Sequence, residues 1–203
     1  MQGISAFRMA CMLGLAISIP TATNAQTVTQ TAIAPVVPAA APVVPVTPPP
    51  VDPHAIFAGS PFTFVGGDHD RLAVEAAIDR VTADLFFAFR GLARSRLRAL
   101  NPLYPLAAVH FTNGQIEVVL FGQPPFRSPE NGTRAPWSSD NGDTFQLAQR
   151  FENGRVVQEI YGPGGMRRNE LVVSPDGHNL VLRVRITASQ LPRPLEYTLS
   201  YHR

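Results

Sequence analysis

Four Asn-Gly dipeptides divide the C-terminal half of the chain into short segments, and they constrain the fold more than any other feature. They begin at Asn113, Asn131, Asn141 and Asn153. Asn-Gly favours the two-residue type I′ turn, because both residues tolerate a positive φ, and this turn joins neighbouring antiparallel strands. The chain after Pro105 is therefore predicted to form hairpins of an antiparallel sheet.

The turn positions also predict the register of the strands. A turn at Asn113-Gly114 places His110 opposite Glu117, and the same turn at Asn153-Gly154 places Phe151 opposite Val156. Apolar and polar residues alternate again over 180–187 and 195–201, and the turn sequence Ser-Pro-Asp-Gly at 174–177 precedes the first of these segments. We expect about six to eight strands in all.

One long helix is predicted before these strands, from Asp68 or Asp70 to about Leu100. Apolar residues recur along it at helical spacing, namely Val74, Ile78, Val81, Leu85 and Leu92. The centre of the helix, 85–89, is apolar nearly all round and should be covered on more than one side. The predicted fold class is α+β, with one long amphipathic helix packed against a curved antiparallel β-meander.

The N-terminal quarter of the chain has the features of an export signal followed by a linker. Residues 1–25 combine Arg8, a short apolar run and a small residue at Ala25, which is typical of a cleaved signal peptide. A retained membrane anchor is the alternative, but the apolar run is shorter than the ~20 residues that span a bilayer. Residues 26–53 hold eight prolines and form an extended Pro/Ala/Val-rich linker.

The remaining residues, 54–203, are predicted to form a single domain. After cleavage it has no transmembrane segment, and it should be periplasmic or secreted. The sequence does not indicate an oligomeric state.

The composition argues against several classes of function. All 17 basic residues are arginine, and removal of the leader leaves 16 of them against 15 acidic residues, so no concentrated positive charge is available for nucleic acid. The one cysteine, Cys11, lies in the leader, so the mature chain has no disulfide and no thiolate ligand. Neither a phosphate-binding loop nor a nucleophile elbow is present, and no cofactor is expected.

Two groups of polar side chains are candidates for chemistry. Asp68, His69 and Asp70 are residue types that bind metals, but three consecutive residues at a helix start rarely converge on one ion, so no metal site is predicted. His110 and Glu117, facing each other across a hairpin, form a candidate proton-transfer pair. Because no nucleophile or oxyanion donor accompanies them, a solvated polar pair is favoured. A small hydrolase or isomerase using this pair in a concave sheet is the alternative function.

A site for an apolar ligand is the leading functional prediction. Phe86, Phe87, Phe89 and Trp137 are large aromatic residues that suit an apolar pocket, and Arg96 projects with the apolar stripe of the helix towards a possible anionic headgroup. Such residues also fill cores and form structural ion pairs, which is the alternative interpretation. We predict a non-enzymatic exported envelope module that binds an apolar small molecule or another envelope protein.

Three segments of the domain resemble a group of exported bacterial proteins of uncharacterised function. They are 91–102, 169–177 and 189–201, and the resemblance extends over most of 68–203. It implies a shared fold of a helix and a β-meander, and no activity is known for the group.

Overall fold

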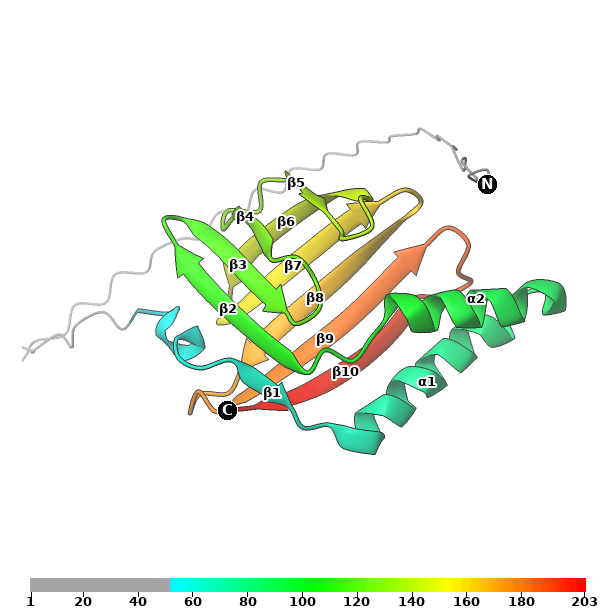
Figure 1. The fold of residues 1–203 in the computed structure, drawn as a ribbon, viewed down its shortest axis with the longest axis horizontal. Coiled ribbons are helices and arrows are strands. Elements are labelled where there is room, and N and C mark those ends of the chain that lie inside the picture. Colours follow the sequence, from blue (N-terminus) through cyan, green and yellow to red (C-terminus); the bar gives the residue numbers. More distant parts are fainter. Residues whose placement is uncertain (1–51) are drawn as a thin grey trace, which may run out of the picture. The chain divides into compact units, whose positions relative to one another are not determined.

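The computed structural model describes residues 52–203, so the predicted signal peptide and nearly all of the predicted linker lie outside it. Two α-helices and ten strands make up most of this part (Figure 1). A short 3-10 helix, η1 (Ala55–Phe57), comes first, and the others are β1 (Phe62–Phe64), α1 (Gly67–Ala83), α2 (Phe87–Leu100), β2 (Leu106–Thr112), β3 (Gln115–Leu120), β4 (Phe126–Pro129), β5 (Ala135–Ser138), β6 (Thr144–Glu152), β7 (Arg155–Gly162), β8 (Gly165–Val173), β9 (Asn179–Ala188) and β10 (Leu195–His202).

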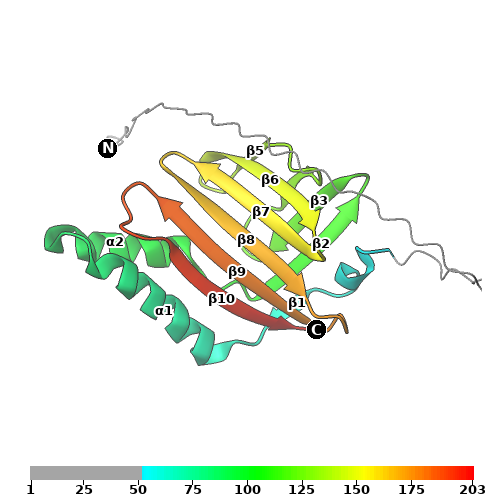
Figure 2. The ribbon, with the colours of Figure 1, turned by 180° about the vertical axis from the view of Figure 1, so that it is seen from behind.

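All ten strands belong to one antiparallel sheet in the order β4-β3-β2-β1-β10-β9-β8-β7-β6-β5. The short strand β1 lies between β2 and β10, so it joins the β2–β4 part of the sheet to the β5–β10 part. The sheet curls until its outer strands meet: Asn131, just after β4, bridges to Arg150 in β6, and the Gly132 amide donates to the Gln149 carbonyl over 2.9 Å. The result is a nearly closed barrel, seen from both sides in Figures 1 and 2.

The predicted α+β fold, with one long helix against six to eight strands, is therefore wrong. The helical region is two separate helices of 17 and 14 residues, and the sheet has ten strands. The prediction missed β1, whose three residues are too few to show an alternating pattern.

The predicted helix breaks at Asp84–Phe86, between α1 and α2. The Leu85 amide makes a tight turn to the Thr82 carbonyl at 3.1 Å, and Phe86 is extended, with ψ at 134°. This allows α2 to return along α1. Two ion pairs hold the helices together, Arg94 Nε–Asp79 Oδ1 at 2.7 Å and Arg98 Nη2–Glu75 Oε2 at 2.6 Å.

The predicted hairpin registers are confirmed. His110 pairs with Glu117 across the first hairpin, and Phe151 pairs with Val156 across the second. At both turns the Asn and the Gly have positive φ, as a type I′ turn requires. At Asn131 and Asn141 only the following glycine has a positive φ, and these two dipeptides lie in longer connections.

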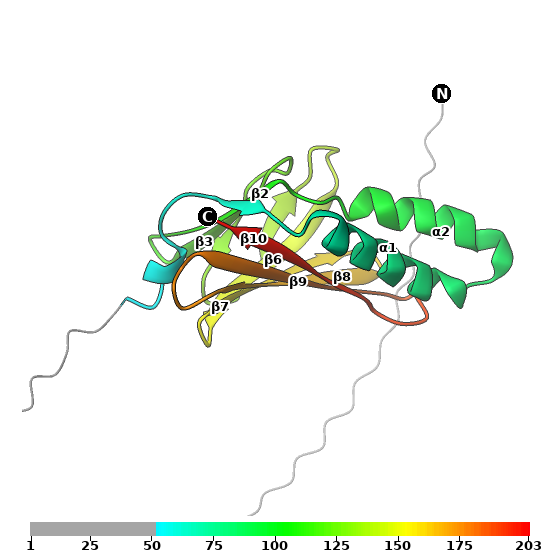
Figure 3. The ribbon, with the colours of Figure 1, turned by 90° about the horizontal axis from the view of Figure 1, so that it is seen from below.

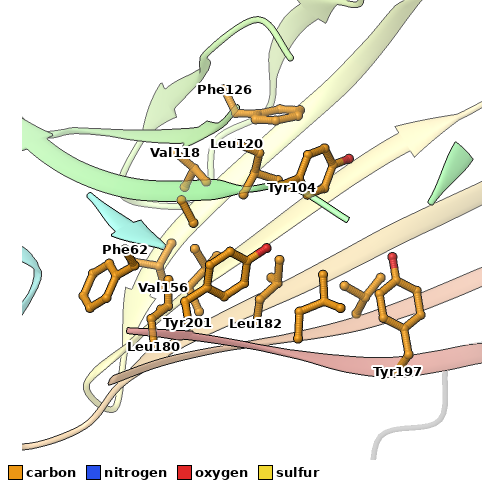
Figure 4. Close-up of a cluster of buried hydrophobic side chains, with 14 of the residues drawn as sticks. Phe62, Tyr104, Val118, Leu120, Phe126, Val156, Leu180, Leu182, Tyr197 and Tyr201 are labelled. Carbon is orange, nitrogen blue, oxygen red and sulfur yellow. The ribbon is translucent and has the colours of Figure 1, made fainter. Parts of the chain in front are cut away.

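Inward-facing side chains from opposite walls of the barrel form the core. Figure 4 shows Tyr104, Leu120, Leu182 and Tyr201 pointing towards one another from different strands and loops. The strictly alternating burial of β10 contributes Leu195, Tyr197, Leu199 and Tyr201, all of which are buried. The hydrophobic effect of this shared interior is what makes curling of the sheet favourable.

Helix α1 replaces a strand along the part of β10 that β1 does not reach. Beyond Tyr201 and His202, which pair with β1, the edge amide of Ser200 donates to Asp70 Oδ2 over 2.7 Å. The Asp70 side chain is only 6% exposed, whereas that of Asp68 is 92% exposed. Neither carboxylate caps the helix, which begins at Gly67 without a side-chain cap.

We predict that Asp70→Ala lowers the free energy of unfolding by about 1.5–3 kcal/mol, because it leaves a buried strand amide without its charged acceptor. Urea denaturation monitored by circular dichroism measures this loss. Asp68→Ala is the matched control and should cost at most about 1 kcal/mol, the value of an exposed carboxylate near a helix start. Equal losses in the two variants would contradict the role given to Asp70.

Candidate functional site

The barrel opens on the side where α2 ends, and a cavity of about 410 Å³ lies in this mouth. Its volume is within the range of roughly 300–1,000 Å³ that is typical of small-molecule sites. Most of the wall is apolar and comes from seven strands and the segment after α2. The apolar lining includes Tyr104, Leu120, Phe126, Trp137, Phe145, Ile160, Met166 and Ile186. The cavity is thus compatible with an apolar small molecule.

Arg167, from β8, is the one arginine in the described lining of the cavity. Its guanidinium makes four hydrogen bonds, all to neutral acceptors. Nε donates to Asn169 Oδ1 at 2.9 Å, Nη1 donates to the Leu100 carbonyl at 3.3 Å and to Asn101 Oδ1 at 3.2 Å, and Nη2 donates to the Tyr197 hydroxyl at 3.3 Å. The group is therefore held rigidly by β8, β10 and the end of α2.

Arg167 has no carboxylate within 4 Å among residues 52–203. Asp143 is the one acidic residue of the lining and makes no ion pair with it. The negative end of the α2 dipole offsets part of the charge, equivalent to about half an elementary charge. A positive charge in a largely apolar cavity is thus left without a full counter-ion.

The surroundings of Arg167 keep it charged. Burial opposes the charge, but the nearby phenols of Tyr197 and Tyr104 outweigh that effect, so the pKa of Arg167 lies above its ordinary value. Burial also raises the pKa values of the Tyr197 and Tyr201 phenols, which stay protonated at neutral pH. At physiological pH the site therefore contains one cation and neutral hydroxyl groups.

A row of buried polar side chains continues from Arg167 around the inside of the barrel. Asn169 Nδ2 donates to Gln158 Oε1 at 2.7 Å, and Ser128 Oγ donates to Gln149 Oε1 at 3.0 Å. Within the described part of the chain, three atoms of this interior are buried and have no hydrogen-bond partner: Gln149 Nε2, Gln158 Nε2 and the Tyr201 hydroxyl.

The structure brings one of the sequence-predicted ligand residues to the cavity. Trp137 lines it, with its ring stacked on Phe126 at 4.4 Å between centroids and its Nε1 donating to the Pro125 carbonyl at 3.3 Å. Arg96 is exposed on α2 and does not line the cavity.

The aromatic residues Phe86, Phe87 and Phe89 are also outside the cavity. They lie at the start of α2, with 63%, 73% and 63% of their surface exposed. The expectation that this apolar segment is covered on several sides is wrong.

His110 and Glu117 are cross-strand neighbours, as predicted, but they do not line the cavity. His110 is exposed, and the Glu117 carboxylate forms an ion pair with Arg127 of β4. The pair lies on the strand face opposite to the buried Val109, Ile116 and Val118. The concave cleft that the enzymatic alternative requires is therefore not built around these two residues.

A second hollow among residues 52–203 is lined by charged side chains that mostly form ion pairs with one another. This wider hollow of about 690 Å³ lies outside β8–β10, and most of its charged lining is paired within itself, Arg168 with Glu170 at 2.9 Å and Arg185 with Glu196 at 2.7 Å. No group of three or more potential metal ligands is found in this part of the chain. None of its helices is both long and apolar enough to cross a membrane.

Comparison with known proteins does not assign a family. No protein-family model and no curated protein matches the chain. Among solved structures, a protein described as "REP1-NXSQ fatty acid transporter" is similar over 73% of this chain and 96% of its own, with 13% sequence identity and a TM-score of 0.42. At this level of similarity, neither fold family nor function transfers. The resemblance to exported bacterial proteins stays a prediction.

We predict that Asn101→Ala lowers the free energy of unfolding by about 1–3 kcal/mol, because Asn101 is buried and links the end of α2 to β10. Its Nδ2 donates to the Leu97 carbonyl at 2.7 Å, and its Oδ1 accepts from the Tyr197 hydroxyl at 2.9 Å. Ser95→Ala, on the exposed side of α2, is the control and should change stability by less than about 0.5 kcal/mol. Chemical denaturation of both variants checks the difference, and a neutral Asn101→Ala would refute the link.

Proposed function

We propose that the domain binds an amphipathic small molecule with an apolar body and one anionic head, such as a long-chain carboxylate. The observation that carries the proposal is Arg167, a cation in an apolar cavity whose four bonds all go to neutral acceptors. A carboxylate at this position would supply the missing counter-charge through charge-assisted hydrogen bonds. The apolar body would lie against Phe126, Trp137 and Ile160.

The fixed geometry of Arg167 supports binding more than catalysis. Its contacts to Asn169, Asn101 and Tyr197 orient the guanidinium before a ligand arrives, which lowers the entropic cost of binding. The cavity lining contains no cysteine, serine–histidine pair or histidine to act as nucleophile or base within the described residues. We propose a non-enzymatic binding protein, acting in the periplasm or outside the cell if the predicted signal peptide is cleaved.

Dodecanoate is a suitable probe, and Trp137 reports its binding because it is the single tryptophan and lines the cavity. We predict that dodecanoate changes Trp137 fluorescence saturably, and that neutral dodecanol binds at least about tenfold more weakly because it lacks the charge. Arg167→Met should weaken dodecanoate binding by about ten- to a hundredfold and leave dodecanol unaffected, since a hydrogen bond to a charged group contributes roughly 1.5–3 kcal/mol.

Arg96→Met is the matched control, because it removes an arginine that does not line the cavity. Asn101→Asp is a second variant, which places a carboxylate beside the Arg167 guanidinium. This carboxylate should compete with the anionic head of the ligand and so weaken dodecanoate binding. Equal affinities of dodecanoate and dodecanol, or an undiminished affinity in Arg167→Met, would refute the role of Arg167. Native mass spectrometry of gently purified protein tests the same proposal by detecting any apolar molecule that copurifies.

A further inference from the structure

The turn between α1 and α2 carries an exposed group of aromatic side chains, which we call the aromatic tip: Phe86, Phe87 and Phe89. Their rings touch one another, with centroids 4.6 Å apart for Phe86–Phe87 and 6.1 Å apart for Phe86–Phe89. Figures 1 and 3 show the helical hairpin projecting sideways from the barrel, with this turn at its far end. The most exposed phenylalanines of the domain therefore lie at its most protruding point.

Within residues 52–203, two arginines of α2 that are not paired with carboxylates, Arg90 and Arg96, lie on the same helix as the aromatic tip. Arg94 and Arg98 are paired with Asp79 and Glu75, and Asp84, just before the tip, is paired with Arg193. Helix α2 contains four arginines and no acidic residue. Arg90 directly follows the tip, and its Nε donates to the Leu85 carbonyl at 2.8 Å, which holds the guanidinium near the turn. Among the described residues, neither Arg90 nor Arg96 has a carboxylate within 4 Å.

One face of α2 combines both properties. Phe89, Leu92 and Arg96 are spaced three and four residues apart, so they lie on the same side of the helix. Leu92 is 56% exposed, which extends the apolar surface away from the tip. An exposed helix with an apolar face ending in arginine is typical of segments that lie in the interface of an anionic membrane.

The shape of the aromatic tip favours a lipid surface over a protein partner. A phenylalanine presents about 150–250 Å² of surface, so three rings at two-thirds exposure offer a few hundred Å², below the roughly 800 Å² per partner of a standard protein interface. A convex end with aromatic rings needs no complementary groove to enter the boundary between headgroups and acyl chains. Anionic headgroups attract nearby arginines at the same time.

We propose that the aromatic tip docks the domain onto an anionic lipid surface, with Phe86, Phe87 and Phe89 inserted between headgroups and Arg90 and Arg96 facing lipid phosphates. The proposal is independent of the ligand proposed for the cavity, because the tip and the cavity lining share no residue. Docking can therefore fail while dodecanoate binding succeeds, and the reverse also holds.

Sedimentation with vesicles tests the docking, using processed protein recovered after export. Vesicles of phosphatidylcholine mixed with phosphatidylglycerol should bind the wild type, and the triple variant Phe86→Ser/Phe87→Ser/Phe89→Ser should bind at least about tenfold more weakly. Phe121→Ser is the matched control, because Phe121 is 61% exposed but follows β3 and is not part of the aromatic tip, so binding should be unchanged. Circular dichroism should show the same fold and melting temperature for all three proteins, since these side chains are exposed.

A reporter placed at the tip gives a second measurement that does not depend on overall binding. In Trp137→Phe/Phe87→Trp the single tryptophan is at the tip, and its emission should shift to shorter wavelength and be quenched by brominated acyl chains. Wild-type Trp137 should show neither change with the same vesicles. Vesicles of pure phosphatidylcholine are the comparison for charge. The proposal would be overturned if the triple variant bound the mixed vesicles as well as the wild type does. It would also be overturned if the wild type bound neither kind of vesicle, or bound both kinds equally.

Discussion

The pairing of β1 with two strands at once is the interaction on which the rest of the domain depends. Phe62–Phe64 joins β2 on one side to β10 on the other, and without it each of these strands would present an open edge of unpaired amides and carbonyls. Because β1 is so short, the remaining edge of β10 is left to α1, where Asp70 accepts from Ser200. The position of the helices, the mouth of the barrel and the contact of Arg167 with the end of α2 all follow from this arrangement.

Local signals in the sequence predicted the local structure well. Both residues of Asn113-Gly114 and of Asn153-Gly154 adopt the positive φ that defines the turn, and the register followed from it. The closure of the barrel has no local signal. The three residues of β1 gain their strand pairing from partners far away in the sequence, and the helix break at Asp84–Phe86 contains neither proline nor glycine. Propensity along the chain therefore suggested a continuous helix, whereas in the structure α2 folds back along α1 and is held there by ion pairs.

The candidate site was predictable only in part, for the same reason. Trp137 was selected for its size and lines the cavity, but the arginine chosen, Arg96, came from helical spacing, and Arg167 was overlooked. A signal for Arg167 was present, since it alternates with the buried Asn169, Leu171 and Val173 and so shares their inward face. This alternation includes Arg167 only if the strand is predicted to begin as early as Gly165. The apolar run 85–89 was taken for core because an exposed aromatic turn and a buried helix centre have the same composition.

The pairing of Phe64 with Tyr201 also determines the order in which the domain can fold. The Asn-Gly hairpins need only neighbouring residues and form on a timescale of about 1–10 μs, whereas contacts between distant segments form later because a long loop must close first. Tyr197, one of the four groups that orient Arg167, lies in the last strand, β10. A chain that lacks β10 therefore loses both the Tyr197 contact to Arg167 and the strand that β1 pairs with to close the barrel.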